Sequence, residues 1–199
     1  MRHYKFLAAR LIPLALALTL VPLPACKVNV KKGARDEDKK VDIETPFGGI
    51  HVSKQADPRD TGLPVYPGAR QMAKEASDDA KSANVNISGP GFGVKVVAIE
   101  YTSDDPPQKL IDYYKDQLKQ YGSVLECHTS GHPASGGAHH PSGKGDSKPL
   151  SCDENDHGNA VELKVGTESN QHIVAIEPQG KGSNFALVYV RTRGKEDTI

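Results

Sequence analysis

Runs of apolar residues, some alternating with polar ones, predict most of the strands. The segment VKVVAIEYTS (94–103) is apolar through its centre, as a strand in the middle of a sheet is, and a shorter run at 85–87 precedes it across SGPGFG. Four later segments, SVLECH, VELKVG, HIVAIE and NFALVYVRTR, also have strand character. Near the N-terminus, VDIETPFGGIHVS (41–53) predicts a small hairpin around Pro46 and a Gly pair. Residues 71–83 leave a weak helix and a loose strand with a loop equally open.

One helix is well specified between these strands. Asp105 stands at the N-cap position, Pro106 at the first helical position and Gln108 three residues after the cap. Gly122 provides a left-handed stop. The apolar stripe of this helix is formed by Leu110, Ile111, Tyr114, Leu118 and Tyr121.

The order β-β-α-β, a long loop and then a β-meander predicts an α+β fold. We expect a largely antiparallel sheet with one main helix packed on one face, in a domain that covers residues 45–199. The expected shared core consists of Val96, Ala98, Leu110, Tyr114, Leu118, Leu163, Val165, Leu187 and Tyr189.

The first 25 residues have the pattern of an export signal. Three basic residues precede the run LIPLALALTLVPL (11–23), which is too short and too rich in proline for a membrane span of about 20 residues. The following stretch, 26–44, has a dense mixture of charges and predicts a tether between the signal and the domain.

The four residues LPAC (23–26) end the signal segment. They resemble the lipobox of bacterial lipoproteins, with Leu23 and Ala25 at the matching positions before Cys26. The resemblance implies that Cys26 carries a diacylglyceryl thioether and an N-acyl chain, which together give stable membrane anchoring. The expected location is therefore the bacterial cell envelope, with the domain facing the periplasm or the cell exterior.

A second resemblance covers residues 63–122. LPVYPGA (63–69), followed by YTSDDPPQKLIDYYKDQL (101–118), is similar to a strand-helix pattern in secreted bacterial proteins and lipoproteins of unknown function. It implies no activity.

The net charge and the absence of known catalytic motifs limit the functions that the sequence favours. Removing the signal takes away three of the 25 basic residues and none of the 25 acidic ones, so the mature chain carries a net charge near −3. This balance argues against a nucleic-acid or anionic-membrane patch as the main function. GPGFG (89–93) predicts a hairpin turn, since a strand and not a helix follows it, and the chain contains no HExxH, GxSxG, GxxxxGK[ST] or CxxC motif. We therefore expect a non-enzymatic protein that binds another envelope component, with an unrecognised hydrolase as a weaker hypothesis.

Two cysteines enclose a segment rich in Gly, Ser, Pro and His. In an oxidising compartment with Cys26 lipidated, Cys127 and Cys152 remain as one predicted disulfide pair. Residues 128–151 between them predict a disordered polar insertion. The alternative function is zinc or copper binding or buffering by the imidazoles of this region, which are His128, His132, His139, His140 and His157.

Overall fold

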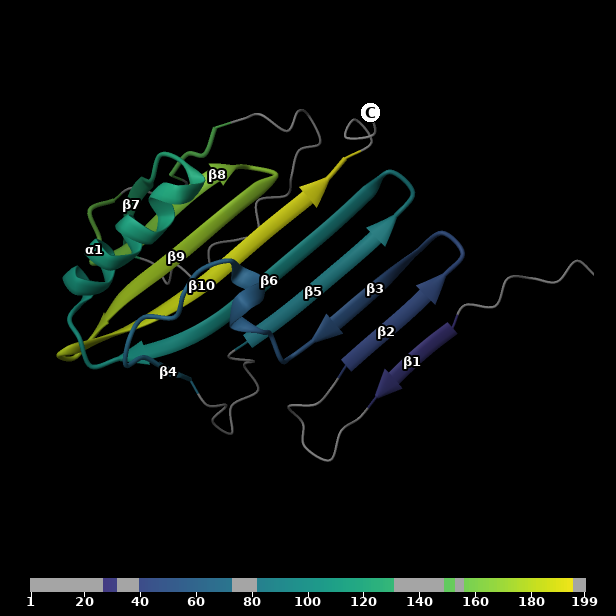
Figure 1. The fold of residues 1–199 in the computed structure, drawn as a ribbon, viewed down its shortest axis with the longest axis horizontal. Helices are drawn as coiled ribbons and strands as arrows, with labels where there is room; N and C mark the ends of the chain where they lie inside the picture. Colours follow the sequence, from purple (N-terminus) through teal and green to yellow (C-terminus); the bar gives the residue numbers. More distant parts are fainter. Residues whose placement is uncertain (1–26, 32–39, 73–81, 131–148, 153–155, 195–199) are drawn as a thin grey trace, which may run out of the picture.

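One antiparallel sheet organises the chain, as Figure 1 shows. The computed structural model describes residues 27–31, 40–72, 82–130, 149–152 and 156–194. Its strands are β1 (Lys27–Lys31), β2 (Lys40–Thr45), β3 (Gly48–Ser53), β4 (Arg70–Gln71), β5 (Ser82–Gly89), β6 (Phe92–Ser103), β7 (Leu125–Thr129), β8 (Ala160–Thr167), β9 (Asn170–Gln179) and β10 (Gly182–Arg193). They lie in the order β1-β2-β3-β5-β6-β10-β9-β8-β7, and β4 pairs with β6 outside this path.

A single α-helix lies on one face of the sheet, among the described residues. This helix, α1 (Pro107–Leu118), continues into the 3-10 turn η3 (Lys119–Tyr121), and a second 3-10 turn, η2 (Pro58–Thr61), contacts β6 and β10. We refer to the face that carries α1 as the front face and to the opposite face as the back face. The α+β class predicted from the sequence is confirmed at this level.

The N-terminal part of the sheet extends beyond the expected domain boundary. β1 and nearly all of β2 lie within the stretch 26–44, which the charge pattern had suggested as a tether. The register of β1 with β2 aligns Lys27 with Glu44 and Lys31 with Lys40. The mixed charges concealed the alternation of Val28, Val30, Val41 and Ile43, the period-two pattern of a strand.

The helix starts one residue later than predicted. Pro106 is the N-cap, and no side chain caps the helix. Asp105 instead accepts hydrogen bonds from the Tyr66 hydroxyl (2.9 Å) and from Lys109 Nζ (2.7 Å). Because Tyr66 and Lys109 both donate to the Asp105 carboxylate, it does not cap the helix as the sequence predicted.

The core lies between α1 and the front face of the C-terminal half of the sheet. Its members from α1 are the predicted Leu110, Ile111, Tyr114 and Leu118, whereas Tyr121 is 38% exposed. The strands contribute Ile99, Tyr101, Val161, Leu163, Val165, Val174, Ile176, Phe185 and Leu187. The Tyr114 hydroxyl anchors the segment after η2, because it donates to Pro64 O (3.2 Å) and accepts from Tyr66 N–H (3.0 Å).

Two expected core residues of β6 face the other way. Val97 and Ile99 are fully buried on the front face, and Val96 and Ala98 point to the back face, where they are only partly buried. Tyr189, on the front face, is also only partly buried. An almost continuously apolar strand gives no alternation to fix its facing, so a shift of one residue exchanges the two sets.

The predicted insertion 128–151 is shorter in the structure at both ends. His128 and Thr129 belong to β7, and Pro149 forms an isolated bridge to Thr167 on β8. Residues 131–148 lie outside the described residues, as do residues 73–81 of the stretch left open between helix and strand.

Candidate functional site

The back face carries a broad set of aliphatic side chains at the N-terminal half of the sheet. The register places them in rows that run across the strands. One row joins Ile43, Ile50, Ile87 and Val94. A second row joins Val41, Val52, Val85, Val96 and Val190, and a third adds Ala83, Ala98, Val188 and Ile173.

These three rows define what we call the aliphatic back face. The rows hold 13 side chains, each of which takes about 4.8 Å across the strands and about 6.8 Å along them, so the face measures roughly 400 Å² in projection. The largest apolar patches on monomers have this size and are often functional. At the edge of the sheet, the backbone register of β1 aligns Val28 with Ile43 and Val30 with Val41.

Burial separates this face from the core on the other side. Every residue of the aliphatic back face is partly buried, apart from Ile50, which is exposed at 37%. On the front face, the corresponding exposures of Val97, Ile99 and Leu187 are zero. In the described part of the chain, α1 and η2 both pack on the front, and no helix packs on the back.

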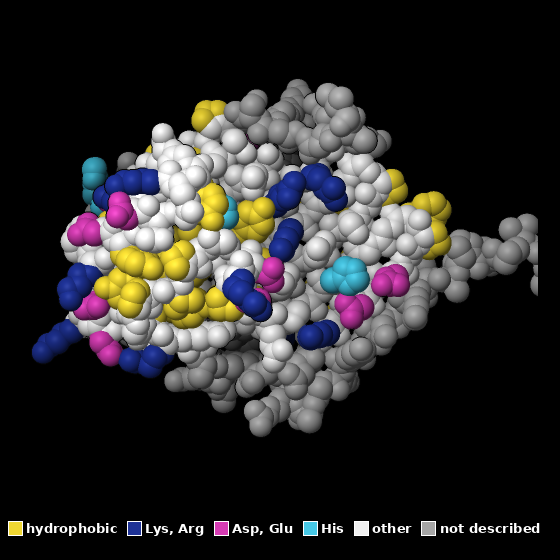
Figure 2. Space-filling model, viewed as in Figure 1, with side chains coloured by type: hydrophobic (Ala, Val, Ile, Leu, Met, Phe, Trp, Pro, Cys, Tyr) yellow, Lys and Arg dark blue, Asp and Glu magenta, His cyan; other side chains and the backbone are white. Residues whose placement is uncertain are grey.

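The front face of the same N-terminal strands is polar. The row behind the aliphatic side chains reads Asp42, His51, Asn86, Lys95 and Arg191 in register. His51 Nδ1 lies 2.8 Å from Asp42 Oδ1, and Lys95 Nζ lies 3.4 Å from Asp60 Oδ1 on η2. Figure 2 shows charged side chains and a histidine on this part of the front surface. The N-terminal strands are therefore apolar only toward the back.

The disulfide predicted from the sequence is present at the β7 edge of the sheet, opposite the β1 edge. Cys127 on β7 is bonded to Cys152, with their Cα atoms 5.5 Å apart. Cys127 is 1% exposed and faces the back, because it aligns with Glu162 on β8. The bridge therefore fixes the segment 149–152 to the edge of the sheet.

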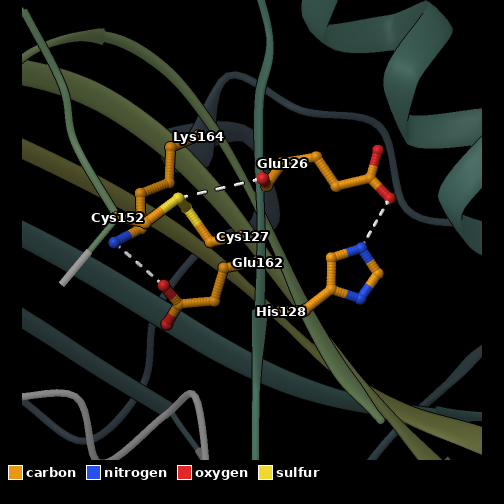
Figure 3. Close-up of a disulfide and its surroundings, with 6 residues drawn as sticks. All are labelled: Glu126, Cys127, His128, Cys152, Glu162 and Lys164. Atoms are coloured by element: carbon orange, nitrogen blue, oxygen red, sulfur yellow. Dashed lines mark hydrogen bonds and ion pairs between the residues drawn. A yellow bond between two sulfur atoms is a disulfide. The ribbon is translucent and has the colours of Figure 1, made fainter. Parts of the chain in front are cut away.

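Charged groups surround the disulfide on both sides of β7. Glu162 and Lys164 form an ion pair of 2.9 Å on the same side as the bridge, with side-chain exposures of 16% and 8% (Figure 3). Glu126 points to the other side, where it pairs with Lys115 of α1 (2.5 Å) and with His128 (3.2 Å). The hydrogen bond from Lys115 is the main cause that lowers the pKa of Glu126. The pair of Glu126 with Lys115 joins the edge strand β7 to α1.

The candidate metal ligands do not gather within the described residues. His128 contacts Glu126, and His157 lies in the loop before β8. No group of three His, Cys, Asp or Glu in the described ranges has the geometry to hold a metal ion. His132, His139 and His140 lie outside those ranges, so zinc or copper binding by the loop stays a prediction. The disulfide removes both Cys127 and Cys152 as thiolate ligands.

Sequence inspection missed a histidine on the front face. His172 of β9 stacks on Tyr121 with ring centroids 3.9 Å apart and lies 4.9 Å from the Tyr189 ring. Its Nδ1 is 2.8 Å from Thr61 O, and since a carbonyl only accepts, Nδ1 carries the proton. Burial lowers the pKa of His172, while the bond to Thr61 opposes this shift. The group joins η2 and η3 to the sheet, and nothing in the local sequence signals this contact.

Comparisons of the chain with protein-family models, curated proteins and solved structures found no match. No helix in the described ranges is long and apolar enough to cross a bilayer. The aliphatic back face is therefore the candidate site that the structure itself provides.

Proposed function

We propose that the protein is an exported, lipid-anchored component of the bacterial envelope that binds another envelope protein through the aliphatic back face. The lipid is attached at Cys26, and the folded domain acts by contact and not by catalysis. The lipobox-like LPAC supports the anchor. The back face supports the binding role, and it carries the proposal.

The physical argument rests on how the chain distributes its apolar residues. Valine and isoleucine rows across five strands stabilise a sheet most when another layer covers them, since burial contributes about 25 cal/mol per Å² of apolar surface. The described helices cover only the front. A partner with a flat apolar surface would bury this apolar area on association. Two β-sheets that pack face to face bury such surfaces at a spacing of about 10 Å.

The lack of charged side chains in the three rows also favours a protein as the partner. In the described residues, its three rows contain only Ala, Val and Ile. Among the described residues of the same face, the charged Glu100 lies next to Ala98 along β6, and the ion-paired Lys164 lies opposite Ile173. An apolar centre with polar groups at its margin is the usual anatomy of a protein interface.

The test compares two substitutions on neighbouring residues of β5. The partner is first identified by cross-linking in cells, and its affinity for the purified protein is then measured. Val85→Asp places a carboxylate in the back face and should weaken binding at least 100-fold, because that charge loses its water on association. Asn86→Asp adds the same charge to the front face of the same strand and should leave the affinity within about two-fold.

Equal affinities for Val85→Asp and Asn86→Asp would contradict the back face as the binding site. The anchor is tested separately by Cys26→Ser, which should move the protein from the membrane to the soluble fraction. An unchanged distribution would contradict lipidation.

A further inference from the structure

Two phenylalanines are displayed at one end of the sheet. Phe47 in the β2–β3 turn is 70% exposed, and Phe92 at the start of β6 is 49% exposed. They are the two most exposed large hydrophobic side chains among the described residues. Figure 2 shows hydrophobic side chains at this end, where the β2–β3 and β5–β6 turns of Figure 1 lie next to each other.

The two turns are in direct contact, so Phe47 and Phe92 lie on neighbouring hairpins. A Cβ atom on Gly48 would lie 2.0 Å from Ser88 O, so only glycine permits this approach of the hairpins. Gly49 N–H donates to Ser88 Oγ at 3.2 Å. The Phe92 ring covers Gly89, where a Cβ atom would lie 2.0 Å from the ring. The Phe92 ring therefore packs on the backbone of its own hairpin, next to the turn that carries Phe47.

The chain enters the sheet at the same end. In the β1–β2 register, Lys27 lies opposite Glu44, and Glu44 is three residues before Phe47. Lys27 follows Cys26 directly in the sequence. Cys26, the proposed lipid site, is thus one residue in sequence from the start of β1, which lies at the end of the sheet that carries the two phenylalanines.

Two arginines are located at this end as well. Arg191 and Arg193 are exposed near the end of β10, and Arg193 aligns with Gly93, the residue after Phe92. Guanidinium groups bind phosphate oxygens through paired hydrogen bonds. Aromatic rings and basic side chains are the groups that membrane-water interfaces favour.

We propose that this end of the sheet rests on the bilayer that holds the lipid of Cys26, with Phe47 and Phe92 in the interface and Arg191 and Arg193 against headgroup phosphates. This inference rests on the lipid anchor of the proposed function. Because Cys26 directly precedes β1, the end of the sheet with Phe47 and Phe92 has a high effective concentration at the bilayer. Weak contacts are therefore enough to orient the domain. The sheet then stands upright, and the aliphatic back face stays available to a protein partner.

The chain contains no tryptophan, so a single introduced indole reports on its own surroundings. Phe47→Trp and Phe92→Trp place the probe at the proposed contact. Lys181→Trp, in the exposed β9–β10 turn, is the matched control, because the 12 residues of β6 separate the two ends by roughly 37 Å. Each variant is purified as the acylated protein, its lipid is confirmed by mass, and it is reconstituted into phosphatidylglycerol–phosphatidylcholine vesicles with chain-brominated lipid.

At least two-fold quenching by brominated lipid is expected for Phe47→Trp and Phe92→Trp, with a blue-shifted emission, and less than 10% quenching for Lys181→Trp. Equal quenching of all three, or of none, in protein with confirmed acylation would overturn the membrane contact and leave the anchor intact. A blue shift of Phe47→Trp in lipid-free solution would overturn it in favour of coverage by a second copy. An unmodified Cys26 would overturn the anchor itself and the orientation that depends on it.

Discussion

On the front of the sheet, the face that carries α1 and η2, Val97 and Ile99 are fully buried, whereas their neighbours on the same strand, Val96 and Ala98, are only partly buried on the back. The residue types are alike, and the strand is the same. The difference lies in the layer above, since the helix that completes the front core has no counterpart on the back among the described residues. The front face therefore holds the core of the domain, and the back face is the surface that we propose for association.

The two ends of the sheet differ in a related way. At the β7–β8 end, the disulfide and a nearly buried Glu162–Lys164 pair occupy the back face. At the β2–β3–β5 edge, the part of the back face that the structure describes consists of Ile50 and the valine rows, without a disulfide or ion pair beside them. Charged groups and the disulfide thus lie on the back face near the β7 edge, and the aliphatic surface lies nearer the β1 edge, where the proposed anchor is attached.

The largest stability effect is expected from the covered core. Tyr114→Ala removes a fully buried ring and two hydrogen bonds, to Pro64 and from Tyr66, and should lower the free energy of unfolding by about 3–5 kcal/mol. Tyr114→Phe keeps the ring and should cost about 1–2 kcal/mol. Urea unfolding followed by circular dichroism measures both. A loss below about 1 kcal/mol for Tyr114→Ala would contradict the assignment of the core to the front face.

Loss of the disulfide should have the next largest effect. Cys127 and Cys152 are 25 residues apart, and the chain-entropy relation gives about 3–4 kcal/mol for closing a loop of this length. The variant with Cys127→Ser and Cys152→Ser should therefore unfold at lower denaturant concentration. Adding reductant to the wild type should reproduce the change, and reductant should not affect the double variant. Equal midpoints for the wild type with and without reductant would show that the bridge does not stabilise the domain.

Adjacent valines of β6 give the sharpest comparison of the two faces. Val97→Ala opens a cavity in the front core and should cost about 2 kcal/mol, while Val96→Ala on the back should cost less than about 1 kcal/mol in the isolated protein. Thermal and urea unfolding of the two single variants test this directly. Equal costs would mean that the back face is covered within the monomer.

A smaller effect is expected in the pH dependence of stability. Because burial lowers the folded-state pKa of His172, the unfolded chain binds the proton more readily. The stability that comes from a neutral His172 is thus present above the unfolded pKa of about 6.5 and is lost as the pH falls through the lower folded pKa. His172→Phe keeps a stacked ring and should reduce this loss. Tyr121→Phe retains the histidine and should keep the wild-type pH dependence, so the same profile in both variants would exclude His172 as its source.

The sequence predicted the elements better than it predicted their facing. The stripe from Leu110 to Leu118 identified the helix and the side it buries, since a period of 3.6 residues is visible without knowledge of the partner. The cysteine pair followed from the expectation of export and of a lipid on Cys26, which leaves Cys127 and Cys152 as the remaining two of three cysteines. Which face of the sheet Val96 and Val97 point to could not be predicted from the sequence, because β6 lacks an alternation of apolar and polar residues and its neighbouring strands decide the register.

The candidate site depended on contacts that no local pattern records. Each valine of the back rows is ordinary in its own strand, and the rows exist only once β3 pairs with β5 and β6 with β10. The stacking of His172 on Tyr121 likewise joins residues 51 positions apart. Phe47 and Phe92 were visible as turn residues, but their proximity required the contact between the two hairpins.

Cross-linking in living cells from two neighbouring positions of β3 tests the central claim most directly. A photoreactive residue is introduced at Ile50, which is 37% exposed on the back face, or at His51, which is exposed on the front. The account predicts a defined adduct with one envelope protein from position 50 and none with that protein from position 51. The same adduct at equal yield from both positions, or none from position 50, would contradict the assignment of the back face as the binding surface.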